Sequence, residues 1–111
     1  MQDNLKFFFN PDSVAVIGAS SNPNKLSYGI LNNLKQYGYQ GNIYPINPHA
    51  DRILDLHCYQ DIASIPGAVD LAVIILPAET IPDVLIACGE KRIKACIIIS
   101  GGFKELGENG K

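Results

Sequence analysis

Apolar residues fall in short, unbroken runs along this chain, and glycines and polar residues separate the runs. Two of them, residues 69–76 and 94–99, are rich in β-branched side chains and end in turn-forming residues. Unbroken apolar runs of this length are typical of parallel strands that are covered on both faces. Residues 13–18 and 42–46 are two shorter strand candidates, and Pro45 indicates the end of the second.

Helical patterns lie between these strand candidates. Residues 27–37 place apolar side chains three and four positions apart, which is the spacing of one helix face. Ser27 is predicted as the N-cap, because its hydroxyl can accept a hydrogen bond from a free backbone N–H, and Gly38 is predicted to end the helix. Residues 80–91 predict a second helix, with Pro82 in the first turn, where its missing N–H costs nothing.

The predicted elements alternate along the whole chain. A short helix over residues 60–65 completes the order strand, helix, strand, short helix, strand, helix, strand. This alternation predicts right-handed βαβ units and a doubly wound parallel sheet with helices on both faces. We therefore expect a single α/β domain over residues 1–111, Rossmann-like and three-layered (α/β/α).

Composition narrows the classes of function. The formal net charge is -2, so the basic footprint of a nucleic-acid-binding protein is absent. No apolar run approaches the ~20 residues of a membrane helix. The chain has three cysteines (Cys58, Cys88 and Cys96) with no Cys-x-x-Cys spacing, and it begins without the pattern of a signal peptide. These features predict reduced thiols in a cytoplasmic protein, with no metal site.

The predicted ligand site lies at the turn that leaves the first strand, because open α/β sheets bind ligands beyond the carboxyl ends of their strands. Gly18 lets the backbone turn tightly. The next three residues, Ala19, Ser20 and Ser21, offer N–H and hydroxyl donors to a phosphate, and Lys25 adds a positive charge. Two simpler alternatives stay open: Gly18 as a mere strand-to-helix connection, and Lys25 as an ordinary solvated lysine.

A nicotinamide dinucleotide is the first ligand to consider, and the sequence argues against it. The G-x-G-x-x-G fingerprint is reduced to Gly18, and Ser20 stands where the second glycine would admit the pyrophosphate. Asn47 follows the second strand in place of the acid that binds the ribose diol. NAD(P) binding is therefore kept only as the least favoured alternative.

Several stretches, taken in order, resemble one known family. They are FFNPDSVAVIGAS at 8–20, NL at 33–34 with GYQG at 38–41, IYPINP at 43–48, DLAVI at 70–74 with PA at 77–78, and IISGGFKE at 98–105. Together they resemble the CoA-binding domain of the NDP-forming acyl-CoA synthetases, which include ADP-forming acetate–CoA ligase and relatives of the succinyl-CoA synthetase α subunit. The same domain opens a group of GNAT-fused protein acetyltransferases.

The resemblance implies a coenzyme A site at the carboxyl edge of the sheet. Residues of the first turn would face the CoA phosphates, and those after the second strand would flank the nucleotide. Pro77 and Ala78 would line a wall for adenine or pantetheine. Residues 100–102 (Ser-Gly-Gly) would meet the thiol end. The implied CoA-binding residues are Gly18, Ala19, Ser20, Ser21, Lys25, Ser27, Asn47, Pro48, His49, Pro77, Ala78, Ser100, Gly101 and Gly102.

Two of these positions depart from the family pattern. His49 replaces a lysine that often follows Asn-Pro, and an unperturbed histidine is mostly neutral at pH 7. Ser27 replaces a glycine that is often found two residues beyond the loop lysine, and a serine there agrees with the predicted N-cap.

The resemblance also implies an incomplete enzyme. In such synthetases the phosphorylated histidine and the ATP-grasp part that binds ADP or ATP lie in other domains, so no catalytic residue is assigned here. We expect the chain to be an N-terminal fragment of a longer acid–thiol ligase that binds CoA or acyl-CoA but does not ligate. Its partners would then be the remaining domains or subunits of the synthetase. The alternative is a regulatory CoA or nucleotide sensor domain of a protein acetyltransferase.

Overall fold

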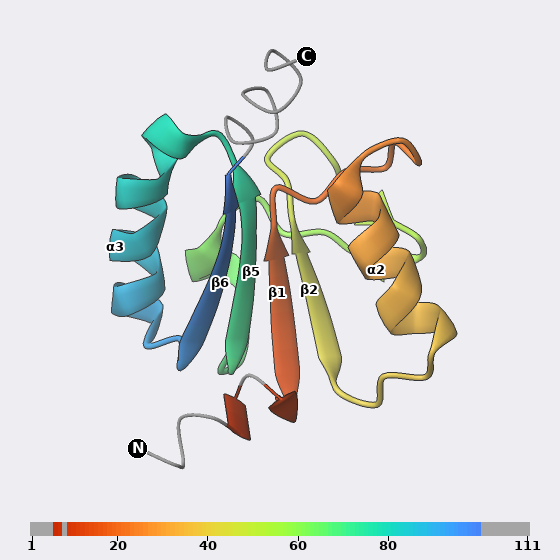
Figure 1. The fold of residues 1–111 in the computed structure, drawn as a ribbon, viewed down its shortest axis with the longest axis horizontal. Helices are drawn as coiled ribbons and strands as arrows, with labels where there is room; N and C mark the ends of the chain where they lie inside the picture. The colour runs from red at the N-terminus through yellow and green to blue at the C-terminus, as the bar shows by residue number, and fades with distance from the viewer. Residues whose placement is uncertain (1–5, 8, 101–111) are drawn as a thin grey trace, which may run out of the picture.

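The computed structural model describes residues 6, 7 and 9–100, and its centre is a four-stranded sheet (Figure 1). The strands of this sheet are β1 (Ser13–Ile17), β2 (Asn42–Ile46), β5 (Leu71–Leu76) and β6 (Ala95–Ser100). Their order is β2-β1-β5-β6, and every neighbouring pair is parallel. The four strand runs predicted from the sequence are therefore confirmed, with ends shifted by one or two residues.

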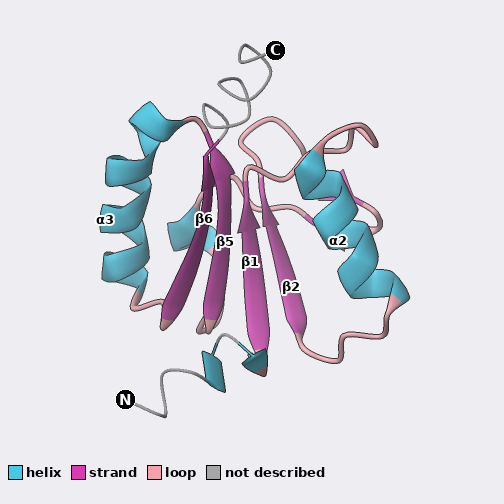
Figure 2. Ribbon diagram, in the orientation of Figure 1, coloured by secondary structure: helices cyan, strands magenta, loops and turns pink. Residues whose placement is uncertain are grey.

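Helices cover both faces of this sheet, so the predicted three-layer α/β/α architecture is confirmed (Figure 2). Helix α2 (Leu26–Gln36) packs its Leu31 with Val14 and Val16 of β1 in one core cluster. Helix α3 (Ile81–Lys91) and the 3₁₀ helix η1 (Ile62–Ser64) pack in a second cluster on the opposite face. Alternate residues of β1 point to opposite faces of the sheet. Because helices cover both faces, every residue of β1 is buried.

Gly38 ends α2 as predicted. Its φ of +76° is left-handed, and its N–H donates to the carbonyl of Lys35 at 3.3 Å. The N–H of Tyr39 donates to the carbonyl of Leu34 at 3.1 Å, which completes a Schellman motif. The predicted N-cap is wrong: Lys25 occupies that position without a side-chain hydrogen bond, and Ser27 is a buried residue inside the helix.

A small hairpin that the sequence did not predict follows β2. Its strands are β3 (Arg52–Ile53) and β4 (Leu56–His57), joined by Leu54 and Asp55, which both have positive φ. Tyr59, just after the hairpin, forms a parallel bridge with Ile46 at the outer edge of β2. The hairpin thus lies along one edge of the main sheet.

The expectation that every apolar run is covered on both faces is wrong for β6. Ile97 and Ile98 keep 38% and 47% of their surface exposed, because β6 is the other edge strand of the sheet. The fully buried strand is β1, which has neighbours on both sides and helices on both faces. None of the described helices is long and apolar enough to cross a membrane.

Candidate functional site

The carboxyl ends of the four strands point to one edge of the sheet, at the top of Figure 1, where the loops predicted to bind ligand lie together. The chain first moves outward from β1 to β2, and later from β5 to β6 on the other side. The switch point therefore lies between β1 and β5, where open α/β sheets form their ligand crevice.

Gly18 sits at this switch point and can be replaced by no other residue without strain. Its φ is +95°, and a Cβ added to it would lie 2.1 Å from the carbonyl oxygen of Ile75 in β5. Gly18 therefore lets the first turn pass directly over the neighbouring strand. The backbone after it is brought to the centre of the carboxyl edge.

The donors expected along this turn are only partly available. The N–H groups of Gly18 and Ala19 both donate to the carbonyl of Ile46, at 3.2 and 3.0 Å. Ala19 is also buried, with 2% of its surface exposed. The Ala19 N–H is therefore already engaged by the end of β2 and is not a free donor at this turn.

The N–H groups of Ser20 and Ser21, in contrast, have no partner among the described residues. The Ser20 hydroxyl accepts from the N–H of Asn22 at 3.0 Å, so its own proton is free to donate outward. The Asn22 carboxamide oxygen then accepts from the N–H of Asn24 at 3.0 Å. These local hydrogen bonds fix the shape of the loop. They leave the N–H groups of Ser20 and Ser21 available at the carboxyl edge.

Positive potential comes from the start of α2. The first N–H groups of any helix lack intrahelical partners, and they carry the positive end of the helix dipole. Lys25 occupies the N-cap position with an exposed side chain, and α2 has no acidic residue in its first turn. Ser27 follows inside the first turn, and only 2% of its surface is exposed, so its hydroxyl does not face the solvent at this edge.

Asn47, predicted to flank the ligand, has both ends of its side chain engaged with protein. Its amide nitrogen donates to the carbonyl of Ala19 at 2.8 Å, and its amide oxygen accepts from the N–H of His49 at 2.7 Å. This carboxamide therefore ties the loop after β2 to the loop after β1. Pro48 and His49 lie beyond it and are exposed at the same edge.

The loop after β5 forms the other wall. Pro77 and Ala78 are exposed, and Ala78 begins the 3₁₀ helix η2 (Ala78–Thr80), which continues into α3. The N–H and hydroxyl of Thr80 both donate to the carbonyl of Pro77, at 3.0 and 2.8 Å. This turn is held by its own backbone and presents a small, mostly apolar surface.

The last part of the predicted site is described only at its start. The backbone of Ser100 ends β6 and pairs with Leu76 of β5, so it reaches the carboxyl edge beside the Pro77 turn. Gly101 and Gly102 lie outside the described residues. The other predicted residues lie on loops or at the starts of helices around this one edge, although they come from three separate parts of the sequence, 18–27, 47–49 and 77–78.

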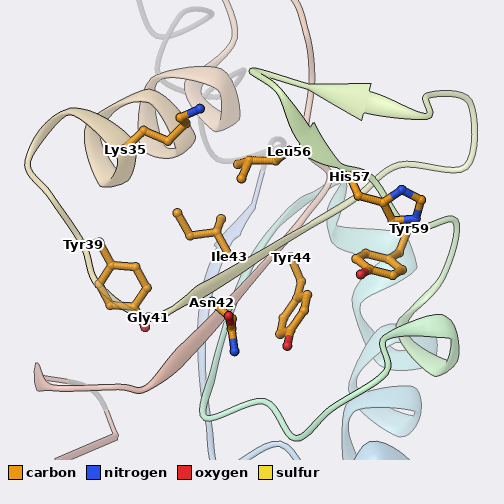
Figure 3. A pocket seen from close by; sticks show the side chains of 9 residues that line it. All are labelled: Lys35, Tyr39, Gly41, Asn42, Ile43, Tyr44, Leu56, His57 and Tyr59. Atoms are coloured by element: carbon orange, nitrogen blue, oxygen red, sulfur yellow. The ribbon is translucent and has the colours of Figure 1, made fainter.

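A separate cleft of about 400 Å³ runs along the outer edge of β2, away from these loops (Figure 3). Figure 3 shows Tyr39 and Lys35 on one side of it and His57 and Tyr59 on the other. Two of its polar groups bond within the protein: the Tyr39 hydroxyl donates to the carbonyl of Pro11 at 2.8 Å, and the Lys35 ammonium donates to that of Leu54 at 2.7 Å.

Two buried cysteines are poorly suited to nucleophilic chemistry. Burial raises the pKa of the Cys58 thiol, and burial together with the neighbouring Cys96 raises that of Cys88 to about 12. Such thiols stay protonated at neutral pH and are poor nucleophiles. No group of three His, Cys, Asp or Glu side chains within the described part of the chain could hold a metal ion.

These observations first define the class of protein to which the chain belongs. A doubly wound parallel sheet, with a lysine and N–H groups that lack partners among the described residues at its switch point, is the architecture of a Rossmann-like nucleotide-binding domain. The family then follows from comparison with known proteins. Residues 12–108 match the family described as CoA binding domain, and the chain belongs to it.

Similar proteins agree with this assignment. The chain is 51% identical over 106 residues to acetate–CoA ligase [ADP-forming] II of Archaeoglobus fulgidus. The aligned region covers 96% of the chain and 16% of that protein. It is 50% identical over 111 residues to the α subunit of acetate–CoA ligase [ADP-forming] I of Pyrococcus furiosus, covering 96% of the chain and 24% of the subunit.

A solved structure agrees as well. The dinucleotide-forming acetyl-coenzyme A synthetase 1 of Ca. Korarchaeum cryptofilum superposes with a TM-score of 0.85 at 44% identity, over 93% of this chain and 22% of that one. The chain therefore spans a quarter or less of the length of these relatives. It is a CoA-binding domain like that of ADP-forming acyl-CoA synthetases, and the resemblance seen in the sequence is confirmed.

Proposed function

We propose that this domain binds coenzyme A across the carboxyl edge of its sheet, with the CoA phosphates at the first turn. The observation that supports the proposal is a set of donors without partners among the described residues: the N–H groups of Ser20 and Ser21 and the first N–H groups of α2, next to exposed Lys25. A phosphate is the natural acceptor for backbone N–H groups gathered at a helix N-terminus.

The chemistry of these donors fits an anion that is held locally. The whole chain has a net charge of -2, so no general positive field attracts the ligand. A helix N-terminus stabilises a neighbouring negative charge by about 0.3–1 kcal/mol, and more in a partly buried geometry. A lysine ammonium adds a charge-assisted hydrogen bond to each phosphate oxygen that it reaches.

The other loops would shape the rest of the ligand site. Pro48 and His49 would flank the nucleotide, held in place by the Asn47 carboxamide. Pro77 and Ala78 would offer an apolar wall to adenine or pantetheine. The thiol end would then lie toward residues 100–102.

We further propose that the chain is the N-terminal part of an acid–thiol ligase and binds CoA or acyl-CoA without ligating it. The relatives that support this are ADP-forming acetate–CoA ligases, of which the chain matches 16–24%. Neither described histidine is placed for phosphoryl transfer: His57 stacks edge-on against Tyr59, and His49 is on an exposed loop. ADP or ATP would bind to other domains or subunits of the ligase.

Calorimetric titration of the 111-residue chain tests the binding proposal directly. We expect a saturable signal with CoA, a weaker one with dephospho-CoA or ADP, and none with NAD. Equal binding of NAD and CoA would favour a general dinucleotide site instead. Mixing the chain with acetate, CoA and ATP should yield no acetyl-CoA, and measurable synthesis would contradict the proposed division of labour.

Lys25 provides the sharpest test of the phosphate position. Lys25→Ala should weaken CoA binding by about 1–2 kcal/mol, or roughly five- to thirtyfold, because one charge-assisted contact is lost. The unfolding midpoint should not move, since the Lys25 side chain makes no capping bond. Lys94→Ala is the matched control: Lys94 precedes β6 at the opposite end of the sheet and should leave CoA affinity unchanged. If both variants bound CoA with equal affinity, Lys25 would be an ordinary solvated lysine that makes no contact with the CoA phosphates.

A further inference from the structure

Helix α3 lies beside β6 in Figure 1, and a tight reversal of the chain joins the end of the helix to the start of the strand. Arg92 has a left-handed φ of +63°, and its N–H donates to the carbonyl of Gly89 at 3.0 Å. The N–H of Ile93 donates to the carbonyl of Cys88, also at 3.0 Å. Cys96 follows as the second residue of β6. The reversal therefore brings a cysteine of the helix close to a cysteine of the strand.

The two cysteines meet in the core cluster on the α3 face. Cys88 belongs to this cluster and is 3% exposed, whereas Cys96 packs against the cluster and is partly exposed. A hydrogen bond joins their side chains. A disulfide bond is about 2.05 Å long, so two sulfur atoms already in hydrogen-bond contact need only a short approach to form one. Of the two residues, only Cys96 is accessible to a small solute.

The third cysteine lies apart from this pair. Cys58 is buried in the core cluster on the α2 face, so the sheet separates it from Cys88 and Cys96. Its thiol lies 3.8 Å from the carbonyl oxygens of both Asn47 and Tyr59. Cys58 is therefore an internal control for any reaction between the other two thiols.

We propose that Cys88 and Cys96 form a peroxide-sensitive pair, in which Cys96 is oxidised first and Cys88 then closes a disulfide that fastens α3 to β6. The order follows from exposure, because the peroxide reaches only Cys96. It also follows from burial, which holds the pKa of Cys88 at about 12 and keeps this residue a thiol. In a reducing compartment both residues stay thiols, as in the structure.

Both steps balance in atoms and electrons. The Cys96 sulfur attacks the terminal oxygen of a peroxide: an S–O bond forms, the O–O bond breaks, and the thiol proton leaves in the alcohol or water that is released. The peroxide takes two electrons from this sulfur. The Cys88 sulfur then attacks the sulfenic acid: the S–S bond forms, the S–O bond breaks, and hydroxide leaves with the Cys88 proton as water. Cys88 is a weak nucleophile, but its contact with Cys96 makes this step unimolecular.

Hydrogen peroxide treatment of the folded 111-residue chain, followed by mass spectrometry, tests the pairing. Free thiols are blocked with iodoacetamide, and endoproteinase Asp-N and trypsin then cut before Asp83 and after Lys91, on the two sides of Cys88. The intact mass should fall by about 2 Da, the Cys88 and Cys96 peptides should be joined, and Cys58 should remain a thiol. A dithiol reductant should restore the original mass.

Three alanine variants separate the roles of the thiols. Cys58→Ala should form the bond at the wild-type rate, within about twofold. Cys96→Ala should resist the peroxide, because both of its remaining cysteines are buried. In Cys88→Ala the sulfenic acid at Cys96 has no partner, so dimedone should trap it at least about fivefold more than in the wild type. If Cys88→Ala does not fold, the wild type and Cys96→Ala still decide.

The bond should also stabilise the folded chain, since a cross-link restricts the unfolded chain. Oxidation should raise the midpoint of thermal unfolding of Cys58→Ala by at least about 5 °C and leave that of Cys96→Ala unchanged. Cys58→Ala is used because it contains only the proposed pair.

Three results would overturn the proposal. They are oxidation of Cys96 to a sulfinic acid in the wild type without a bond to Cys88, a bond that involves Cys58 or joins two chains, and an unfolding midpoint that fails to rise when the bond forms. The first result would make the two thiols core residues that only pack together. None of these measurements involves CoA, so a failed CoA titration would remove only the proposed function.

Discussion

Two strand-to-helix turns meet at the carboxyl edge, and they are built differently. Between β1 and α2, residues 18–25 run through a polar loop in which the N–H groups of Ser20 and Ser21 have no partner in the described part of the chain. Between β5 and α3, the chain passes from Pro77 straight into η2, and Thr80 satisfies the Pro77 carbonyl twice. The first turn depends on contacts with other strands, whereas the second is held by bonds within itself.

Under the proposed function, this difference gives each turn a separate role in binding CoA. Unpaired donors at the start of α2 suit the charged part of a ligand, and a self-satisfied apolar turn suits an uncharged wall. It also predicts that the first turn is the more sensitive to substitution, because its shape depends on β2 and β5. Three substitutions test this, in order of decreasing expected effect.

Gly18→Ala should have the largest effect. The added Cβ would lie 2.1 Å from the Ile75 carbonyl oxygen, at a φ of +95° that side chains rarely adopt. We expect a loss of about 3 kcal/mol or more in the free energy of unfolding, measured with urea. Gly89→Ala in α3 is the matched control, because a Cβ there meets nothing within 4 Å and should be neutral or stabilise the helix. Equal stabilities would show that the first turn can move off β5.

Asn47→Asp should have an intermediate effect. The change replaces the amide that donates to Ala19 with an oxygen that repels its carbonyl, and it preserves the acceptor for the His49 N–H. We expect a loss of about 1–3 kcal/mol in unfolding free energy, together with weaker CoA binding. Asn33→Asp, on the exposed side of α2, should stay within about 0.5 kcal/mol of the wild type. An Asn47→Asp variant as stable as this control would mean that the two loops do not need the carboxamide.

Thr80→Val should have the smallest effect. It keeps the shape of the side chain and removes only the hydroxyl bond to Pro77, and the backbone bond from the Thr80 N–H remains. Thermal unfolding should show a loss of no more than about 1 kcal/mol, because this hydrogen bond is exposed. CoA affinity should not change. A large loss of affinity would mean that the second turn also takes part in gripping the charged end of the ligand.

Sequence patterns predicted the regular elements well and the irregular ones poorly. Gly38 was predictable as a helix end because its role is local. The hairpin at Arg52–Ile53 and Leu56–His57 was not, because each strand has two residues and its turn uses Leu54 and Asp55 at positive φ, without the usual glycine or asparagine. Ser27 looked like an N-cap by type, but the helix begins one residue earlier and buries it.

The candidate site divides in the same way. Its location followed from the sequence, since alternating strands and helices bring the carboxyl-end loops to one edge. Which donors remain free did not follow. Ala19 and Ser20 look alike as backbone donors in the sequence, but the carbonyl of Ile46 takes the first, and the second has no described partner. Likewise, Asn47 could be placed near the ligand, but its two bonds to neighbouring loops appear only in three dimensions.

The sequence by itself therefore determined the fold class, the family resemblance and the edge at which we propose that a ligand binds, because these depend on local periodicity and on short motifs. Only the tertiary structure decided why Gly18 must be glycine, which N–H groups remain unpaired, and which edge of the sheet is left open. These properties depend on contacts with Ile75, Ile46 and Tyr59, which are distant in the chain and are brought close by parallel strand pairing.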